Sequence, residues 1–389
     1  MTSPISVVVE EARTEDRILR TLTVDATLQA TYEITGPVLP PSLDTFDFAA
    51  IATVFQAMRE RRPLHVEGPV TTTLLRNLEE FQEVWSVWQP SLYRPIRITA
   101  AEERASSPQQ QQRKGVFAFS GGVDSAAALL RHYSGDLNRR AVVPVAAFMV
   151  HGFDIPLNAT DAFKTAHDAA AASLKELDLP LYAVKTNWRH TLCKRWEMEY
   201  CTGLIACIHQ FAGMANVGVL GSDEDYAHLV IPWASTPITN PLLSGGTFTI
   251  QTECGALTRT ERVALAARFP KIASSLRVCW QGPMSGRNCG KCEKCLRTQL
   301  NFLASGLEPV CFDNKLTAAQ VLGIAASNPI QLVFLEEIAA AARARGIKAS
   351  WLSALEISLV KNKALLPFRS TLNTLRSTAR RVLKPAART

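Results

Sequence analysis

One stretch near the first third of the chain constrains the fold more than any other. An apolar run at 116–119 is followed by Ser-Gly-Gly-Val-Asp-Ser and then by an alanine- and leucine-rich segment. The run predicts a strand, and 123–133 predicts a helix. Gly121 and Gly122 between them permit a sharp turn and a close approach of the backbone to a ligand. Strand, glycine turn and helix in this order indicate an α/β fold.

The same turn carries groups that suit an anionic ligand. The first N–H groups of a helix have no partner within the helix and attract negative charge. Ser120 and Ser125 add hydroxyl groups, and Asp124 adds a carboxylate that could hold Mg²⁺. The turn is not a Walker A loop, because no Gly-Lys-Ser/Thr sequence ends it. An ordinary Gly-Gly turn would account for the glycines but not for the Ser, Asp and Ser.

Strand-like and helical patterns alternate after residue 115, which predicts an open, doubly wound parallel sheet. The expected strands are 116–119, 142–150, 181–186 and 216–221, and the expected helices are 123–133, 161–177, 200–212, 261–269, 293–305 and 329–345. Ligands of such sheets bind beyond the carboxyl ends of the strands. We therefore expect His151 to contact a nucleotide or substrate, and Asp223 with Glu224 to contact Mg²⁺ or substrate. The alternatives are a structural loop histidine and a solvated turn.

Composition divides the chain into five segments. Residues 1–100 combine strand-like and helical runs and predict a small N-terminal α+β domain, and the polar, glutamine-containing segment 101–114 predicts an exposed linker. The sheet domain is expected at 115–310. A helical extension at 311–364 and a basic tail at 365–389 complete the prediction.

Four cysteines form a second motif. Cys279, Cys289, Cys292 and Cys295 have the spacing C-x9-C-x2-C-x2-C, and short C-x2-C loops can present two sulfurs to one Zn²⁺. Four protein ligands leave no open position, so a zinc site here would be structural. An iron–sulfur cluster and redox-active thiols are the alternatives. The five other cysteines have no paired spacing and are interpreted as small buried hydrophobic residues.

The Ser-Gly-Gly-Val-Asp-Ser sequence resembles the signature of the PP-loop ATP pyrophosphatases, which have a HUP-like fold. With the four cysteines, it resembles the 7-cyano-7-deazaguanine synthase (QueC) family over residues 115–305. The family usually has Ser-Cys-Tyr at the first zinc cysteine, where this chain has Val-Cys-Trp.

The resemblance implies an enzyme that splits ATP into AMP and pyrophosphate. It would activate a carboxylate or amide oxygen of a small molecule for attack by ammonia or another amine. The implied ATP and Mg²⁺ site comprises Ser120, Gly121, Gly122, Val123, Asp124 and Ser125, of which Ser120, Asp124 and Ser125 would act in catalysis. The implied Zn²⁺ ligands are Cys279, Cys289, Cys292 and Cys295.

Two other functions remain open on the sequence. One is a tRNA-modifying sulfurtransferase, in which cysteines would carry sulfur. The other is a non-catalytic module that binds nucleotide and zinc. Arg259 and Arg262 could meet pyrophosphate or a substrate carboxylate through a bidentate contact, or they could be surface helix charges.

Charge and hydropathy indicate where in the cell the protein is found and which surfaces it could contact. The longest apolar run, 141–150, is far shorter than a membrane span, and no secretory signal is apparent, so we expect a cytoplasmic protein. Residues 350–389 hold eight Lys and Arg and one acid, which equals the chain's net charge of +7. This tail could contact RNA or an anionic membrane, or be a disordered solubilising extension. The sequence is compatible with a homo-oligomer.

Overall fold

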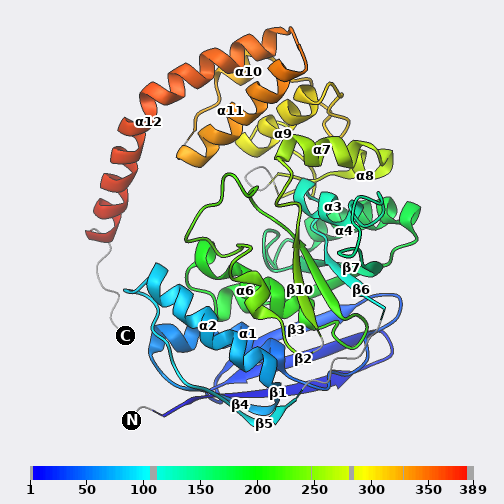
Figure 1. The fold of residues 1–389 in the computed structure, drawn as a ribbon, viewed down its shortest axis with the longest axis vertical. Helices are drawn as coiled ribbons and strands as arrows, with labels where there is room; N and C mark the ends of the chain where they lie inside the picture. The colour runs from blue at the N-terminus through cyan, green and yellow to red at the C-terminus, as the bar shows by residue number, and fades with distance from the viewer. Residues whose placement is uncertain (1–2, 106–111, 247, 280–283, 327, 383–389) are drawn as a thin grey trace.

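The computed structural model describes residues 3–105, 112–246, 248–279, 284–326 and 328–382, with side chains as far as Leu366. One large sheet runs through the molecule, with the N-terminal strands at one end and the C-terminal helices at the other (Figure 1). The fold is mixed α/β, and most strand pairs are parallel, which confirms the predicted fold class at that level.

The sheet has ten strands in the order β10-β9-β6-β7-β8-β3-β2-β1-β4-β5. Their bounds are β1 (Ile5–Arg13), β2 (Arg17–Val24), β3 (Leu28–Thr35), β4 (Leu64–Thr71), β5 (Ile98–Arg104), β6 (Lys114–Ala118), β7 (Val143–His151), β8 (Leu181–Thr186), β9 (Val217–Gly221) and β10 (Thr249–Glu253). Strands β6 to β10 form one half of the sheet, and every strand pair within this half is parallel. Because β7 and β9 flank β6 on opposite sides, the chain changes direction along the sheet at β6. This is the place where ligands bind in doubly wound sheets.

The central strands are apolar throughout because both of their faces are covered. Val116 and Phe148 face a core that includes α1 (Asp47–Glu60) and α6 (Trp196–His209). Their neighbours Phe117 and Met149 face a second core, with α3 (Val123–Leu130) and α4 (Thr160–Leu174). Burial on both faces is what a continuous apolar strand predicts.

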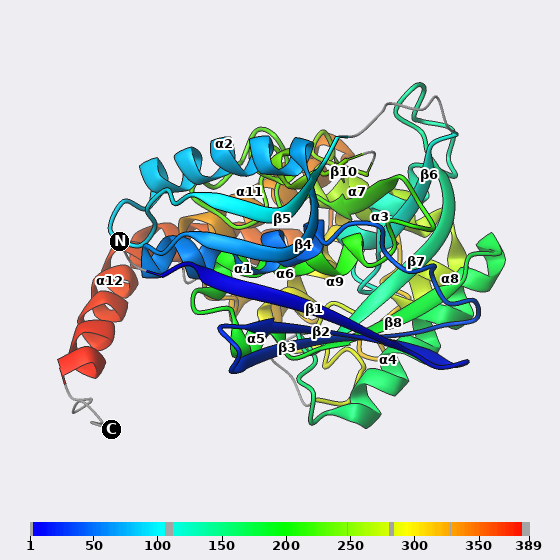
Figure 2. The ribbon, with the colours of Figure 1, turned by 90° about the horizontal axis from the view of Figure 1, so that it is seen from below.

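The N-terminal strands join the same sheet through β3, which pairs antiparallel with β8, Tyr32 opposite Thr186. Helices α1 and α2 (Thr72–Trp88) pack on one face of this half, while no helix crosses β1 and β2 in the view of Figure 2. Alternate residues of β2 are accordingly buried and partly exposed. The segment 101–114 is not the exposed linker that the sequence predicts along its whole length. Residues 101–104 belong to β5, and Lys114 is the first residue of β6. Residues 106–111 lie outside the described part.

Short elements complete the sheet region: η1 (Lys175–Leu177), α5 (Trp188–Thr191), η2 (Asn240–Leu243), α7 (Arg259–Ala267) and α8 (Pro270–Ser275). A third core then joins α9 (Glu293–Ala304), α10 (Ala318–Leu322), α11 (Pro329–Ala344) and α12 (Ser350–Val382). This confirms the C-terminal helical region. Helix α12 extends well into the predicted basic tail, whose last residues, 383–389, lie outside the described part.

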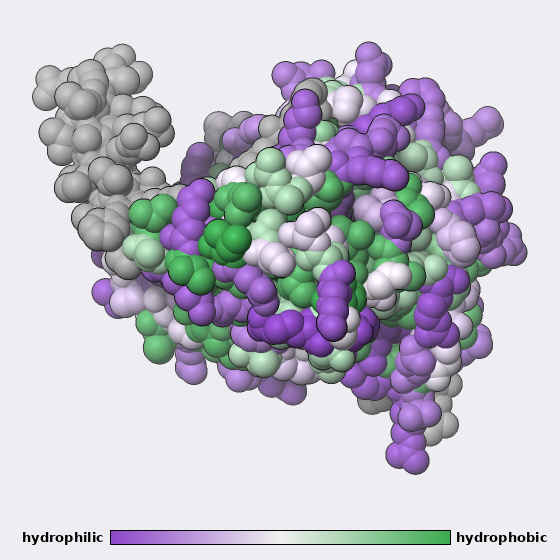
Figure 3. Space-filling model, turned by 90° about the horizontal axis from the view of Figure 1, so that it is seen from above, coloured by the Kyte–Doolittle hydropathy of each residue, from purple (hydrophilic) through white to green (hydrophobic). Residues whose placement is uncertain are grey.

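Helix α12 leaves large apolar side chains uncovered. Ile357 is 59% exposed and Val360 is 71% exposed. Figure 3 shows hydrophobic side chains gathered at this end of the molecule, beside the grey segment. None of the described helices combines the length and the apolar content that crossing a membrane requires.

Candidate functional site

The glycine turn lies at the carboxyl end of β6, as the sequence predicts. Gly121 has φ +75°, a left-handed conformation that favours glycine. Its carbonyl accepts a hydrogen bond of 2.8 Å from the main-chain N–H of Arg277. Gly221 at the end of β9 also requires the absence of a side chain, because a Cβ there would lie 2.6 Å from the carbonyl oxygen of Asp124. Two separate parts of the chain therefore hold the turn in place.

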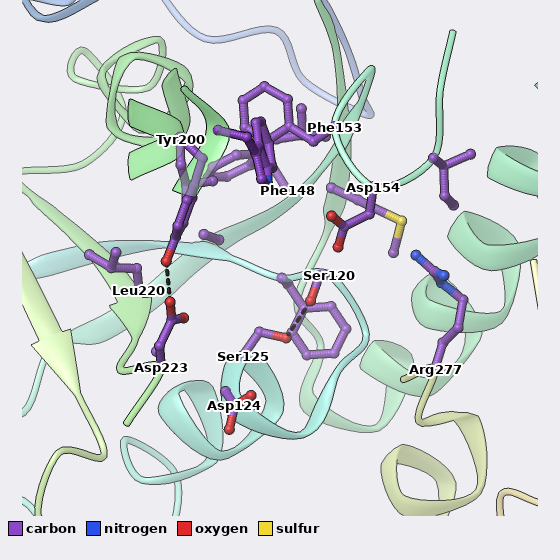
Figure 4. Close-up of a pocket in the computed structure, with 18 of the residues that line it drawn as sticks. Ser120, Asp124, Ser125, Phe148, Phe153, Asp154, Tyr200, Leu220, Asp223 and Arg277 are labelled. Carbon is purple, nitrogen blue, oxygen red and sulfur yellow. Dashed lines mark hydrogen bonds between the residues drawn. The ribbon is translucent and has the colours of Figure 1, made fainter. Parts of the chain in front are cut away.

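The turn presents hydroxyl groups and an open helix start. Helix α3 begins after Gly122, and no side chain caps it. The Ser120 and Ser125 hydroxyl oxygens lie 3.2 Å apart (Figure 4). The Gly122 N–H donates to Ser120 Oγ over 3.3 Å. Backbone N–H groups, two hydroxyls and the positive end of a helix dipole thus converge, which is an arrangement suited to phosphate oxygens.

The turn opens onto a cavity of about 280 Å³. One end is apolar and mostly aromatic: Phe148, Phe153, Trp196, Tyr200, Leu204 and Leu220. The ring of Trp196 is held by Arg189, whose guanidinium carbon lies 3.9 Å from the ring centroid. Such a surface can receive a planar aromatic group by stacking.

Charged side chains also line this cavity. Asp154 and Asp223 follow the ends of β7 and β9; Asp154 lies on the side of Arg277, whereas Asp223 lies beside Tyr200 (Figure 4). Arg277 and Lys294 come from the cysteine-rich segment. A smaller adjoining cavity of about 60 Å³ is lined by the turn, Asp154, Arg277, Lys294 and Cys279. An aromatic wall and the polar turn thus line one cavity, and the smaller cavity beside it is lined by three cationic side chains, Arg259, Arg277 and Lys294.

Asp124 lies in the turn but does not present a free carboxylate. Its Oδ2 accepts from Arg259 Nη1 at 2.6 Å, and its Oδ1 accepts from Arg262 Nη1 at 2.8 Å. Burial alone would raise the pKa of Asp124, but the two arginines outweigh it and hold the pKa well below its usual range. The sequence expectation that this carboxylate faces Mg²⁺ is therefore not met in this arrangement. Nor are the arginines surface helix charges, since both are buried.

Arg262 also connects the turn to the end of β9. Its Nη1 donates to the Ser222 carbonyl at 2.6 Å, and its Nη2 donates to the Glu224 carbonyl at 3.1 Å. Burial, with Asp223 and Asp124 adding to the effect, raises the pKa of the Glu224 side chain to about 8. Glu224 does not line the cavity at the turn; it lines a separate small one together with Arg259, Arg262 and Arg297.

The two predicted strand-end residues are placed differently. Asp223 lines the cavity, and its Oδ2 accepts hydrogen bonds from the Tyr200 hydroxyl and from Trp233 Nε1 (2.8 Å for the second). His151 does not line it. Its imidazole stacks on Phe163 with centroids 4.4 Å apart and bonds through Nε2 to the Pro156 carbonyl, 3.1 Å away. The expected nucleotide contact of His151 is absent from this geometry, because the strand turns its ring toward α4.

The four cysteines of the predicted metal site converge. Every Sγ of Cys279, Cys289, Cys292 and Cys295 lies within 4.8 Å of the others. Two of the separations are 3.8 Å (Cys289–Cys295) and 3.9 Å (Cys292–Cys279). Tetrahedral coordination with Zn–S bonds of about 2.3 Å requires sulfurs about 3.8 Å apart. The four side chains therefore fit Zn²⁺, and together they complete its coordination.

Local contacts prepare this cluster for a metal. The N–H groups of Lys291 and Cys292 donate to Cys289 Sγ at 3.5 and 3.3 Å. Burial would raise the pKa of this thiol, but the two donors outweigh it and lower the pKa to about 7. Asn288 fixes the approach of the chain, because its Oδ1 accepts from the Val278 N–H at 2.8 Å.

Several cavity residues were not predicted as site residues. Phe153 and Asp154 belong to a strand end at which a ligand is expected, although neither is named there as a contact. Arg277, Lys294 and the rest of the aromatic wall were not expected at the cavity. One signal could have suggested two of them. Arg277 lies two residues before the first cysteine, and Lys294 lies between the last two. Both residues must therefore lie close to the site at which the four cysteines converge.

Comparisons with known proteins add no assignment to this geometry. No family model matches the chain, and no significant match was found among curated proteins or among solved structures.

Proposed function

We propose that the protein is an ATP-dependent adenylating enzyme of the PP-loop type. It would split ATP into AMP and pyrophosphate, and transfer AMP to an oxygen of a small-molecule carboxylate or amide. Ammonia or another amine would then displace AMP. The observation that carries the proposal is the Ser-Gly-Gly-Val-Asp-Ser turn at the switch point of the sheet, opening onto a cavity lined by aromatic and charged side chains.

The cavity offers complementary groups for both parts of a nucleotide. The hydroxyls of Ser120 and Ser125 and the first N–H groups of α3 would receive phosphate oxygens. Arg277 and Lys294 would balance the charge that builds up on the leaving pyrophosphate, which is electrostatic stabilisation by groups already in place. The aromatic end would stack against the base or against a planar acceptor. No lysine of the Walker type is present in the turn, which favours cleavage at the α phosphate.

Mg²⁺ would accompany ATP and neutralise phosphate charge. It prefers carboxylate oxygens together with phosphate oxygens. Asp154 and Asp223 line the cavity and have the right chemistry. Asp124 could offer a carboxylate to Mg²⁺ only if Arg259 and Arg262 released their hydrogen bonds to it. Asp154, which lines both cavities, is therefore the better candidate. Asp223 already accepts two hydrogen bonds at Oδ2, and burial raises its pKa. Asp124 is assigned to holding the turn.

The products of ATP test the proposal. The purified protein is incubated with ATP labelled with ³²P at the α or, in parallel, at the γ position, with Mg²⁺, an ammonium salt and a panel of aromatic and deazapurine carboxylic acids. We expect AMP and pyrophosphate to form in equal amounts and only with the right acid. ADP and phosphate as sole products would contradict it. Tight ATP binding with no turnover on any acid or amide would favour the non-catalytic module.

Substitution of the turn provides the matched test. Ser120→Ala removes a hydroxyl that faces the cavity, and we expect at least a tenfold loss of pyrophosphate release. Ser134→Ala is the control, since this serine lies after α3 and outside the cavity. An equal effect of both substitutions would show that Ser120 has no particular role.

A further inference from the structure

Cys279 of the cysteine cluster and the glycine turn line the same small cavity, although at least 150 residues separate them in the sequence. Arg277 forms the direct connection. Its main-chain N–H donates to the Gly121 carbonyl at 2.8 Å, and its Nη1 donates to the Cys279 carbonyl at 2.9 Å. One residue is thus bonded to the turn on one side and to the first cysteine of the cluster on the other.

Lys294 forms the second connection. It lies between Cys292 and Cys295, so its main chain is fixed wherever those two sulfurs are fixed. Its side chain lines both the larger and the smaller cavity, together with Asp124 and Asp154. Lys291 belongs to the same loop, but it is exposed and lines neither cavity. The cluster therefore aims one of its two lysines at the turn and the other at solvent.

We propose that metal binding by the four cysteines sets the affinity of the turn for the phosphates of ATP, because it fixes Arg277 and Lys294 beside them. The proposal rests on the ATP-binding function given above. It assigns the metal centre a regulatory role: the metal does not touch the nucleotide, but loading it completes the cationic wall of the nucleotide site.

Thermodynamics makes the proposal reciprocal. If the metal raises the affinity for ATP by some factor, ATP must raise the affinity for the metal by the same factor. Couplings of this kind are typically about 5- to 150-fold. Without the metal, hydrogen bonds such as those of Asn288 and of the Lys291 and Cys292 N–H groups are left to hold the loop. The segment that carries both cations then loses the coordination bonds that would join its four sulfurs. We expect a coupling of at least about tenfold.

The test measures both affinities on the full chain. Binding of ATP with Mg²⁺ is titrated by calorimetry with zinc-loaded protein and with protein depleted by a chelator, and circular dichroism checks that the depleted protein is folded. Zinc affinity is measured by competition with a chromophoric chelator, with and without saturating ATP. We expect the two ratios to agree.

Two variants separate the local effect from loss of folding. Lys294→Met should keep one zinc per chain by elemental analysis, bind ATP at least tenfold more weakly, and reduce the coupling. Lys291→Met, its control in the same loop, should match the wild type in all three measurements. If the zinc-depleted protein unfolds, the ATP affinities of the two zinc-loaded variants are compared with that of the wild type instead.

The outcomes distinguish this inference from the proposed function. Equal ATP affinity in zinc-loaded and folded zinc-depleted protein would overturn the inference and leave ATP binding intact. Wild-type ATP affinity in a zinc-loaded Lys294→Met variant would also overturn it. Failure of every form to bind ATP would overturn the proposed function, and the inference with it.

Discussion

At the scale of single residues, Asp124 has a different task from the one its motif suggests. A carboxylate that only faced Mg²⁺ could be removed without loss of stability, and the sequence alone leads to that expectation. In the structure, Asp124 compensates two buried arginines. Removing one partner of such a pair leaves a buried charge uncompensated, which destabilises the folded state.

Asp124→Asn should therefore destabilise the fold as well as abolish ATP turnover. We expect a loss of about 1–3 kcal/mol in the free energy of unfolding at pH 7, measured with urea. The lowered pKa means that the ion pairs stabilise the protein above pH 3.8 and that this contribution is lost as the pH falls below it. Unchanged stability in the variant would show that Arg259 and Arg262 do not depend on Asp124.

The sequence indicated the residues of the turn but not their partners. Glycines and hydroxyls at fixed spacing predict local geometry, because a turn is determined by neighbouring residues. Arg259 and Arg262 reach Asp124 from more than 130 residues away, and no local pattern encodes such a contact. The same reason explains why His151 was expected at the cavity: its position in the strand was right, but the direction of its ring depends on α4.

At the scale of secondary-structure elements, a buried histidine connects the end of α6 to η2. His209 is buried, its Nε2 lies 3.0 Å from the Leu243 carbonyl, and its ring packs on Phe248. Burial lowers its pKa from 6.5 to about 4, despite the hydrogen bond to the carbonyl. Folding therefore favours the neutral ring, and stability rises with pH between about 4 and 6.5.

Acidification from pH 7 to pH 4 should cost up to about 3 kcal/mol through His209. Urea unfolding at half-unit pH intervals measures this slope. His209→Gln, whose amide can still donate to Leu243, should flatten the curve between pH 6.5 and 4. His132, whose pKa burial lowers to about 4 as well, should keep part of the slope in that variant. An identical slope in variant and wild type would exclude His209 as the source.

The metal loop allows another comparison at this scale. Cys292→Ser should lower the zinc content well below one per chain and reduce the melting temperature, because a closed zinc site contributes folding energy. Cys311→Ser is the matched control, since this cysteine packs near the cluster without belonging to it. Elemental analysis and thermal unfolding of both variants check the prediction. A brown protein containing iron and acid-labile sulfide would point instead to an iron–sulfur cluster.

The elements that the sequence predicted are those with continuous apolar runs or long helical periods. Strands β4, β5 and β10 were missed, and the reasons for β4 and β10 can be identified. β4 contains Gly68 and Pro69 at a shift in its pairing register, which breaks the strand pattern. β10 reads Thr-Ile-Gln-Thr-Glu at the edge of the sheet, so it lacks the apolar face that identifies a buried strand.

At the scale of the whole molecule, the net positive charge is concentrated at the C-terminal end of the sequence. Residues 365–389 contain six Lys and Arg and no acid. Deleting them should leave pyrophosphate release unchanged, because the turn and the cysteine cluster lie before them. It should also remove salt-sensitive attachment to anionic vesicles or RNA, since screening weakens such contacts.

Vesicle sedimentation and RNA gel shifts at 50 and 200 mM salt test this prediction. A variant with Arg376, Arg380 and Arg381 changed to Gln is the control for charge without truncation. It should reproduce most of the loss if charge is responsible. Equal binding by truncated and full-length protein would identify the segment as a solubilising extension.

The joining of the two halves of the sheet lay beyond sequence analysis. Local patterns indicate that 1–100 form strands and helices, but they do not say which strand pairs with which. The pairing of β3 with β8 connects the halves, and α1 packs against α6 in the same core. Both contacts join residues that are far apart in the sequence, so no local sequence pattern predicts them.

That pairing has a consequence for the order in which a ribosome makes the protein. β3 ends at Thr35, but the strand that covers its outer edge does not begin until Leu181. During the synthesis of everything in between, the nascent chain carries an open row of N–H and C=O groups beside apolar residues such as Tyr32 and Ile34. Such an edge is a template for pairing with other chains. The window of greatest exposure to misassembly therefore closes when β8 emerges, well before the metal loop is made.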